Sequence, residues 1–450
     1  MAGGDQGMLS DRPTRWGALR ASVSLSALFL VVYGACNHIT SLRSDVGSWV
    51  YGWERHIPFV PLMIVPYLSI DLFFVAAPFL CTGRRELRQF SWRVVLAVCV
   101  AGAFFLAMPL RFTFERPHAG GVLGAVFDWF REMDKPFNQF PSLHIALRTI
   151  LADLYARHLR TWARVASDVW FSLIGASTLL VYQHHVADVA GGFALAALCF
   201  YVFGDAGWRS PVAHNRRVGA MYAAATLVLL AAALWLRPWG LLLLWPAAGT
   251  LLLTAAYFGL GHSVYRKAGG RLPLSARVVM GPVLAGQELS RRYYARRSNP
   301  WDRVTDRVWV GRVLAEREAV GAREQGVTAV LDLTSEFGAP AAFRALHYLN
   351  LPILDLTAPL DADLERAVAF IEEHCGRGAV YVHCKAGYSR SAAVVATYLL
   401  HTGAADTPEA AVEKVRAARP GIVIRPEALE AIRAFHAARA AAGTNAPADP

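Results

Sequence analysis

The segment VYVHCKAGYSRSAAVVATYLL places five residues between Cys384 and Arg390, after an apolar run typical of a buried strand and before the start of a helix. The backbone N–H groups of such a loop, and the positive end of a helix starting near Ser391, converge on one point and can bind a phosphate. The same field lowers the pKa of a thiol, so we expect Cys384 to be a thiolate nucleophile. The planar guanidinium of Arg390 can hold two phosphate oxygens. The segment therefore predicts a reactive thiol in a phosphate cradle.

Other residues of this loop fit the same chemistry. Gly387 permits a tight loop where a Cβ would intrude, and Ser391 can donate to the sulfur when it leaves. Attack on a phosphomonoester also needs an acid for the departing oxygen. We assign this role to Asp355, which ends a strand in LPILDLTAP, and interpret the competing Asp332 in VLDLTSEF as a structural residue at a strand end. The loop residues expected to bind phosphate are Lys385, Gly387 and Ser389.

A second set of candidates lies in RFTFERP (111–117), NQFPSLH (138–144) and STLLVYQHHVADVAGG (177–192). His184 and Asp188, four apart at a helix entry, would share one face, so the carboxylate could fix the imidazole tautomer and raise its nucleophilicity. His144 could protonate the leaving group. A phosphohistidine intermediate needs no metal, although a histidine at a helix end is often structural. The groups expected to neutralise phosphate oxygens are Arg111, Arg116 and the hydroxyl of Ser142.

The composition indicates that much of the chain is embedded in a membrane. Of 450 residues, 55% are hydrophobic and 18% are charged, and the mean hydropathy is +0.33. About 20 residues cross a bilayer as a helix. We expect spans at about 22–40, 59–81, 92–110, 142–157, 165–182, 187–204, 218–236 and 239–262. Ionisable residues interrupt the fourth to sixth runs, which we therefore expect to face the bundle interior.

The distribution of cations predicts the orientation. Alternate connections carry 21 Lys and Arg residues on one side and seven on the other. Cytoplasmic loops are enriched in these residues, so the first set is expected to be cytoplasmic, with both termini. The first apolar run is expected to remain as an anchor. These patterns predict a multi-pass protein of a bacterial-type inner membrane.

The pattern changes after the last apolar run. Residues 263–303 are basic with apolar residues interleaved, and we expect them to lie on the inner leaflet, with a solvated linker as the alternative. From 304 to 437, strands alternate with helices, which indicates an α/β domain. We therefore predict an all-α polytopic bundle over 21–262, after a cytoplasmic tail at 1–20, then this linker and the α/β cysteine-phosphatase domain, and a disordered tail at 438–450.

The α/β part resembles the dual-specificity protein-tyrosine phosphatase family. The segments HCKAGYSRSAAVVATYLL, LPILDLTAP and GIVIRPEALEAIRAFH look most like the mitochondrial phosphatidylglycerophosphate phosphatases, whose substrate is a lipid phosphate. The resemblance implies that Cys384 is the nucleophile, Arg390 the phosphate binder and Asp355 the acid. Tyr388 stands where that branch often has a basic residue, so the resemblance does not define the head group.

Residues 60–205 resemble the type 2 phosphatidic acid phosphatase superfamily. FPSLH together with QHHVADVAGG is most similar to its inositol phosphorylceramide synthase-like branch. The phosphatase form of this pattern has two cations at places that hold Pro109 and Thr178 here. The resemblance implies phosphoryl transfer but leaves open whether water or a lipid hydroxyl is the acceptor.

Together these features predict a bifunctional enzyme of lipid phosphate metabolism. The six scattered cysteines show no spacing of a metal site, and we expect no metal and no cofactor. Cys375 is expected to be a helix-buried thiol, with a protective disulfide to Cys384 as the alternative. The net charge is +11, and only four of the 45 Lys and Arg residues are lysines. This excess of arginine favours a coding bias over nucleic-acid binding. The expected partners are membrane lipids. Two alternatives remain, namely a phosphoprotein substrate at the thiol site and a lipid-sensing or anchoring role for the first half.

Overall fold

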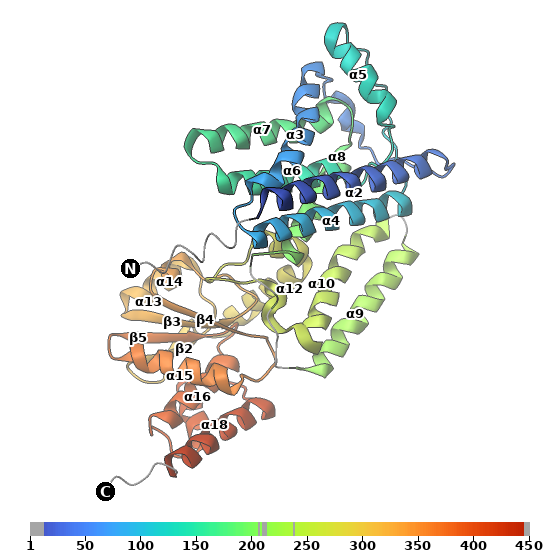
Figure 1. The fold of residues 1–450 in the computed structure, drawn as a ribbon. Helices are drawn as coiled ribbons and strands as arrows, with labels where there is room; N and C mark the ends of the chain where they lie inside the picture. Colours follow the sequence, from blue (N-terminus) through green and yellow to red (C-terminus); the bar gives the residue numbers. More distant parts are fainter. Residues whose placement is uncertain (1–12, 206–207, 209–213, 237–238, 445–450) are drawn as a thin grey trace, which may run out of the picture. The chain divides into compact units, whose positions relative to one another are not determined.

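The computed structural model describes residues 13–205, 208, 214–236 and 239–444. The chain divides into two compact units, Met1–Asp205 and Ala206–Pro450 (Figure 1). The last two predicted spans therefore belong to the same unit as the α/β domain, whereas the sequence pattern grouped them with the first six. Most of the predicted tail at 1–20 lies outside the described residues.

The first unit is a helical bundle with an apolar core. Its elements are α2 (Arg15–Ser41), η1 (Gly52–His56), η2 (Pro61–Met63), α3 (Ile64–Leu80), α4 (Arg84–Ala107), α5 (Gly121–Met133), α6 (Leu143–His158), α7 (Thr161–Leu180) and α8 (Val186–Val202). Buried side chains such as Phe74, Val98, Ile150 and Phe171 pack between these helices. Helix α5 lies within residues 111–141, between the third and the fourth predicted spans. Its apolar residues recur at helical spacing, and Phe127 is buried.

The second unit begins with a helical hairpin. Helix α9 (Arg216–Trp235) packs along α10 (Leu244–Ala255), and the Thr226 hydroxyl donates to Thr250 over 2.9 Å. Two short turns extend α10, the π-helical η4 (Ala256–Leu260) and the 3-10 helix η5 (Gly261–Tyr265). We call α9, α10 and these turns the hairpin. The basic stretch that follows contains two further helices, α11 (Leu274–Val279) and α12 (Gly281–Ala295).

Several apolar helices indicate that the chain associates with a membrane. Five helices in the described ranges are long and apolar enough to cross one: Arg15–Ser41, Pro61–Leu80, Arg84–Ala107, Arg216–Trp235 and Leu244–Tyr265. The other three predicted spans are helical, as α6, α7 and α8. Helix α8 is apolar but shorter, and charged residues interrupt α6 and α7. The count of eight spans is therefore not confirmed.

The α/β domain contains a mixed five-stranded sheet in the order β1-β2-β5-β3-β4. Its strands are β1 (Trp301–Arg303), β2 (Val308–Gly311), β3 (Val327–Thr334), β4 (His347–Ile353) and β5 (Ala379–His383). The last four strands are parallel, and β1 pairs antiparallel at the edge. Strands such as β5 are buried along their whole length because helices cover both faces of the sheet. The prediction of an α/β domain is confirmed.

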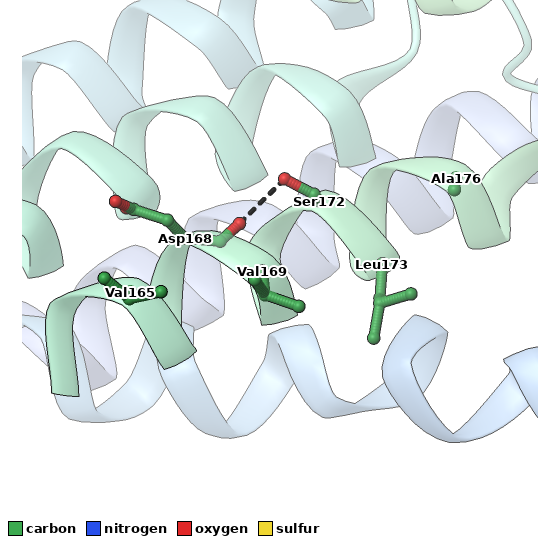
Figure 2. A pocket seen from close by; sticks show the side chains of 6 residues that line it. All are labelled: Val165, Asp168, Val169, Ser172, Leu173 and Ala176. Atoms are coloured by element: carbon green, nitrogen blue, oxygen red, sulfur yellow. Dashed lines mark hydrogen bonds between the residues drawn. The ribbon is translucent and has the colours of Figure 1, made fainter. Parts of the chain in front are cut away.

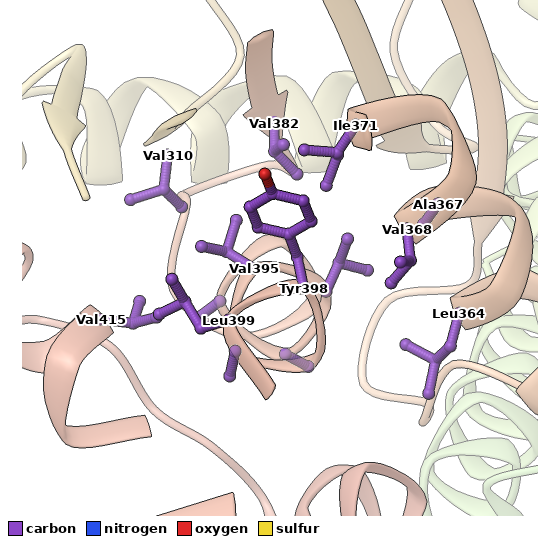
Figure 3. Close-up of a cluster of buried hydrophobic side chains, with 14 of the residues drawn as sticks. Val310, Leu364, Ala367, Val368, Ile371, Val382, Val395, Tyr398, Leu399 and Val415 are labelled. Carbon is purple, nitrogen blue, oxygen red and sulfur yellow. The ribbon is translucent and has the colours of Figure 1, made fainter. Parts of the chain in front are cut away.

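Helices flank the sheet on both sides. On one face lie α13 (Glu316–Glu324) and α14 (Ala341–Arg344), and on the other α15 (Asp361–Cys375), α16 (Arg390–His401), α17 (Pro408–Ala418) and α18 (Pro426–Thr444). In Figure 3, Val395 and Leu399 of α16 lie among side chains of β2, β5, α15 and α17. Helix α16 is therefore fixed by the largest core of the domain. Helix α18 includes the first residues of the tail predicted to be disordered, a correction to that prediction, and 445–450 lie outside the described residues.

A buried ion pair ties the segment after the hairpin to the sheet. The Lys267 ammonium donates to the Asp332 carboxylate over 2.7 Å and to both the carbonyl and the hydroxyl oxygen of Thr334. Both charged side chains are about 1% exposed. Burial raises the pKa of Asp332, but Lys267 and His383 outweigh it and hold this pKa below its usual range. Each charge therefore depends on the other.

The variant Lys267→Met should lower the free energy of unfolding of the second unit by roughly 3–5 kcal/mol, because it leaves a buried carboxylate without its partner. Thermal unfolding of the purified full-length protein in detergent measures this change. The exposed Lys414 provides the control, since Lys414→Met should have little effect. An equal loss in both variants would contradict the role of the ion pair.

Candidate active sites

The thiol site lies where β5 ends and α16 begins, at the carboxyl end of the parallel strands. The side chain of Cys384 is buried, and its Sγ lies 3.4 Å from the Ser391 hydroxyl oxygen. Burial raises the pKa of the Cys384 thiol, but the Arg390 guanidinium and the hydrogen bond from Ser391 outweigh burial, so the pKa lies below its ordinary value. The geometry thus brings together the predicted nucleophile and the two groups that stabilise it as a thiolate.

Arg390 is held by contacts that sequence reasoning missed. Its Nη2 and Nη1 donate to the two Glu336 carboxylate oxygens over 2.7 and 3.2 Å, and Nη1 also donates to the Ile353 carbonyl over 2.8 Å. Glu336 is itself buried and accepts from the backbone N–H and hydroxyl of Ser335. Burial lowers the pKa of Arg390, but the carboxylates of Glu336 and Asp355 outweigh burial and raise this pKa above its ordinary value. A glutamate just after a strand gave no sequence signal of this role.

The predicted acid, Asp355, lies beside the cradle. Its carboxylate accepts from Lys385 Nζ over 2.7 Å and lies 3.2 Å from Arg390 Nη2. Burial raises the pKa of Asp355, but Arg390 and Lys385 lower it further than burial raises it. The competing Asp332 is occupied by Lys267 and by the Tyr348 hydroxyl, as its structural interpretation requires. Of the two carboxylates, only Asp355 pairs with cradle residues.

The cradle loop is shaped by Gly387 and by Arg419, which sequence reasoning missed. Gly387 has φ +74°, and a Cβ there would lie 2.6 Å from the Gly311 carbonyl. Arg419 donates to the carbonyls of Gly387 and Ala386, each over 2.9 Å, and its Nη1 pairs with Asp302. These two hydrogen bonds tie the outer side of the cradle loop to Arg419. The only signal for Arg419 was a cation before the turn at Pro420.

Ser389 and Tyr388 belong to the cradle loop, whereas Cys375 lies before the start of β5. Ser389 precedes α16 and is half-buried, and Tyr388 beside it makes an edge contact with Tyr294 of α12 at 5.8 Å between ring centroids. Cys375 ends α15 and is a free thiol, whose sulfur donates to the Glu372 carbonyl and accepts from the Tyr398 hydroxyl. The disulfide with Cys384 is therefore not formed.

The described part of the second unit contains a catalytic domain of a known class. The family described as "Dual specificity phosphatase, catalytic domain" matches residues 312–437, which include Cys384 and Arg390. The chain therefore contains a cysteine-based phosphatase domain of the dual-specificity type, a phosphoric monoester hydrolase. This part of the resemblance is confirmed, whereas the match starts after residues 60–205, whose resemblance remains a prediction.

Relatives of known name match this part of the chain. It is 46% identical over 101 residues to the rat (Rattus norvegicus) "Phosphatidylglycerophosphatase and protein-tyrosine phosphatase 1", which is 21% of this chain and 52% of that protein. It is 43% identical over 99 residues to the mouse (Mus musculus) "Dual specificity protein phosphatase 12", 21% and 29% of the two chains. Identity to the Arabidopsis thaliana "Phosphatidylglycerophosphate phosphatase PTPMT2" is 31% over 142 residues, 30% and 62% of the two chains. The chain thus spans less than two thirds of each of these relatives.

One solved structure that resembles part of the chain is that of PTPMT1 in complex with PI(5)P. It is 28% identical and covers 32% of this chain and 99% of its own, with a TM-score of 0.30.

In the first unit, residues from distant segments form a partly buried polar cluster. His184 interacts electrostatically with His144 and with Asp134, and Asp134 also interacts with Arg116. Arg116 donates to the Gln183 amide oxygen over 2.9 Å. Two imidazole nitrogens, His144 Nε2 and His184 Nδ1, are buried without a hydrogen-bond partner within the described ranges. The structure therefore brings together His144, His184 and Arg116 of the predicted set. Sequence reasoning missed Asp134 and Gln183.

The other members of that set are placed differently. Asp188 Oδ2 lies 3.8 Å from His184 Nδ1, too far for a hydrogen bond, and accepts instead from the backbone N–H of His185 over 2.8 Å. Asp188 therefore caps α8, and the predicted tautomer-fixing bond is not formed. Ser142 caps α6 and is fully buried. The Arg111 side chain is exposed and, where the structure describes the chain, makes no hydrogen bond or ion pair.

Two observations delimit these sites. The described residues include no group of three or more His, Cys, Asp or Glu placed to hold a metal ion.

A groove of about 460 Å³ runs along α7 and is lined by Val165, Asp168, Val169, Ser172, Leu173 and Ala176 (Figure 2). It includes none of the candidate residues. Apart from Asp168 and Ser172 its walls are apolar, as on an exposed helix face.

Alkylation of Cys384 should report its lowered pKa. Iodoacetamide reacts with the thiolate, so the rate should rise through a midpoint below the usual thiol pKa of about 8.5. Ser391→Ala should move this midpoint to higher pH, because the hydrogen bond from Ser391 favours the charged sulfur. Cys384→Ser protein supplies the background from the other thiols. A midpoint at or above that of a free thiol would contradict the assignment.

Proposed function

We propose that the second unit is a phosphomonoesterase that acts on a phosphorylated membrane lipid. One observation carries the proposal, namely the placement of Cys384, Arg390 and Asp355 around a single cradle. The class of domain supports the chemistry. The relatives whose names refer to phosphatidylglycerophosphate, and the shared unit with the apolar hairpin, support a lipid substrate. By its cations, the chain would lie in a bacterial-type inner membrane with this domain in the cytoplasm.

In the proposed reaction the Cys384 thiolate attacks phosphorus, and the bond from phosphorus to the lipid oxygen breaks. Asp355 gives its proton to that oxygen, which leaves as an alcohol. Arg390 and the loop N–H groups hold the phosphate oxygens as charge shifts between them. Water then attacks the phosphocysteine, and Asp355 takes a proton from it while Ser391 stabilises the departing thiolate.

The paired state of Asp355 fits this sequence of steps. Without substrate, Lys385 and Arg390 keep the carboxylate ionised. A phosphate dianion in the cradle competes for the same two cations and adds negative charge beside Asp355. Both effects raise the pKa of the carboxyl, so binding itself favours the protonated acid.

Activity of the full-length protein on phosphatidylglycerophosphate in mixed micelles tests the proposal. Cys384→Ser should reduce it to background, Asp355→Asn should reduce it by about 10²–10⁴-fold, and orthovanadate should inhibit it. A phosphotyrosyl peptide is the competing substrate. A higher kcat/KM for the peptide would favour the phosphoprotein alternative, and hydrolysis that survives Cys384→Ser would contradict the thiol mechanism.

We propose phosphoryl transfer at a histidine site as a second function, in the first unit. The unpartnered nitrogens of His144 and His184, gathered with Arg116 in a partly buried cluster, favour it. His184 would attack a lipid phosphate or phosphodiester, His144 would protonate the leaving oxygen, and Arg116 would bind phosphate oxygens. Ser142 and Arg111 would contribute only from a rearranged site. By the charge distribution this site would open on the external side.

His184→Ala should lower release or transfer of phosphate from lipid substrates in detergent by at least about 100-fold, since it removes the nucleophile. The assay uses the Cys384→Ser background, so that the thiol site contributes nothing. His38 is exposed on α2, and His38→Ala should leave turnover unchanged. Unchanged turnover in His184→Ala would reduce the first unit to an anchor or a lipid sensor.

A further inference from the structure

The loop that carries Asp355 is tied to the hairpin by two hydrogen bonds. The Tyr257 hydroxyl donates to the Asp355 carbonyl oxygen over 2.9 Å, and the Asn215 side-chain amide donates to the Leu356 carbonyl over 2.8 Å. Leu356 has φ +62°, a conformation that a side chain other than glycine rarely adopts. We call residues 354–358 the acid loop. Two consecutive carbonyls of this loop, at the residue with positive φ and the one before it, are thus held by residues outside the phosphatase domain.

The hairpin fixes these two donors relative to each other. Tyr257 lies in the π-helical turn η4 and is 4% exposed, and its ring stacks on Tyr222 of α9 at 5.7 Å and 11°. The side-chain oxygen of Asn215 caps α9 by accepting from the backbone N–H of Val218. The backbone N–H of Asn215 donates to the Tyr257 carbonyl. Single π-helical turns inside helices are frequent at functional sites. Both donors therefore depend on the packing of α9 against α10.

The position of these bonds matters for proton transfer. The carboxylate of Asp355 already bridges Lys385 and Arg390, so its side chain is fixed by the cradle. Its backbone is fixed by the hairpin. If the backbone were released, the loop could withdraw the carboxyl from the leaving oxygen. Attack by Cys384 on phosphorus would still occur, because the nucleophile and Arg390 are held by other contacts.

We propose that Tyr257 and Asn215 are positioning residues that make the hairpin part of the phosphatase active site. Through them, protonation of the leaving group requires a folded hairpin, so the thiol site reaches its full rate only when the hairpin is packed as in the membrane-bound chain. This inference rests on the proposed phosphatase function. It adds that the hairpin controls one step of the reaction rather than serving only to attach the domain.

The test compares two leaving groups in the full-length protein. Phosphatidylglycerophosphate releases an alcohol that needs a proton, whereas p-nitrophenyl phosphate releases a stable phenolate that hardly needs one. Tyr257→Phe should lower kcat/KM, which covers the steps up to phosphoryl transfer to Cys384, about tenfold or more on the lipid and less than about twofold on the aryl ester, as expected for loss of acid catalysis. Asn215→Asp should act in the same direction, because it keeps an oxygen to cap α9 and removes the donor to Leu356.

The matched control is Tyr222→Phe, which removes a hydroxyl from the stacked partner ring without touching the bond to Asp355. It should leave the ratio of the two rates unchanged. In the background of Asp355→Asn, Tyr257→Phe should cause no further loss of activity on the lipid, because Tyr257 acts through the carboxyl group of Asp355. A tenfold further loss in that background, or an equal loss in Tyr222→Phe, would overturn the inference.

Hydrogen exchange separates this inference from the phosphatase assignment. Tyr257→Phe should speed amide exchange in residues 354–358 by about tenfold in a protein whose other segments exchange as before. If wild-type protein hydrolyses neither ester but shows this change, the proposed function fails and the structural coupling stands. Unchanged exchange together with an unchanged ratio of rates in an active enzyme would overturn the coupling.

Discussion

The phosphatase domain depends on keeping a buried cation next to a buried sulfur. The guanidinium of Arg390 is about 2% exposed, and a cation so deep in a protein is costly unless anions and carbonyls compensate it. Glu336 and the Ile353 carbonyl provide that compensation and fix the plane of the fork. Enough positive charge remains to hold the Cys384 thiol below its ordinary pKa despite burial. The Asp355 carboxylate lies 3.2 Å from the same guanidinium, and Arg390 and Lys385 hold its pKa below the usual range despite burial.

The supporting structure follows from the same need. A cradle of inward N–H groups leaves carbonyls on its outer side, and Arg419 binds two of them while Asp302 neutralises Arg419. Below the cradle, Lys267 and Asp332 form a second compensated pair beside the buried His383. Lys267 comes from the segment after the hairpin, and the acid loop is bound by Tyr257 and Asn215. The electrostatics of the cradle are thus completed by residues that lie outside residues 312–437, the part that matches the family.

The sequence was sufficient where chemistry is local. The strand, loop and helix around Cys384 follow from hydrophobic pattern and spacing, and so does the fold class of the domain. It was insufficient where a partner is distant in the chain. The contact of Glu336 with Arg390 spans 54 residues, and that of Lys267 with Asp332 spans 65. The contacts of Arg419 with the cradle loop span 32 and 33 residues, and no periodicity in the sequence marks any of these partners. Asp188 shows a different limit. Its spacing from His184 suits one helix face, but α8 begins at Val186, so His184 lies outside the helix and the Asp188 carboxylate binds the backbone N–H of the N-cap His185 instead.

The first unit presents a different physical problem, ionisable groups inside an apolar bundle. His144 lies on α6, and His184 and Arg116 lie in connections between helices. Ionisable groups in such surroundings rarely add net stability. A purely structural cluster would also be expected to satisfy its hydrogen bonds internally. Here the Gln183 amide nitrogen and two imidazole nitrogens are buried without partners within the described ranges, while Arg116 and Asp134 supply opposite charges next to them. These atoms without partners are the observation that supports the proposed phosphate site over an anchor.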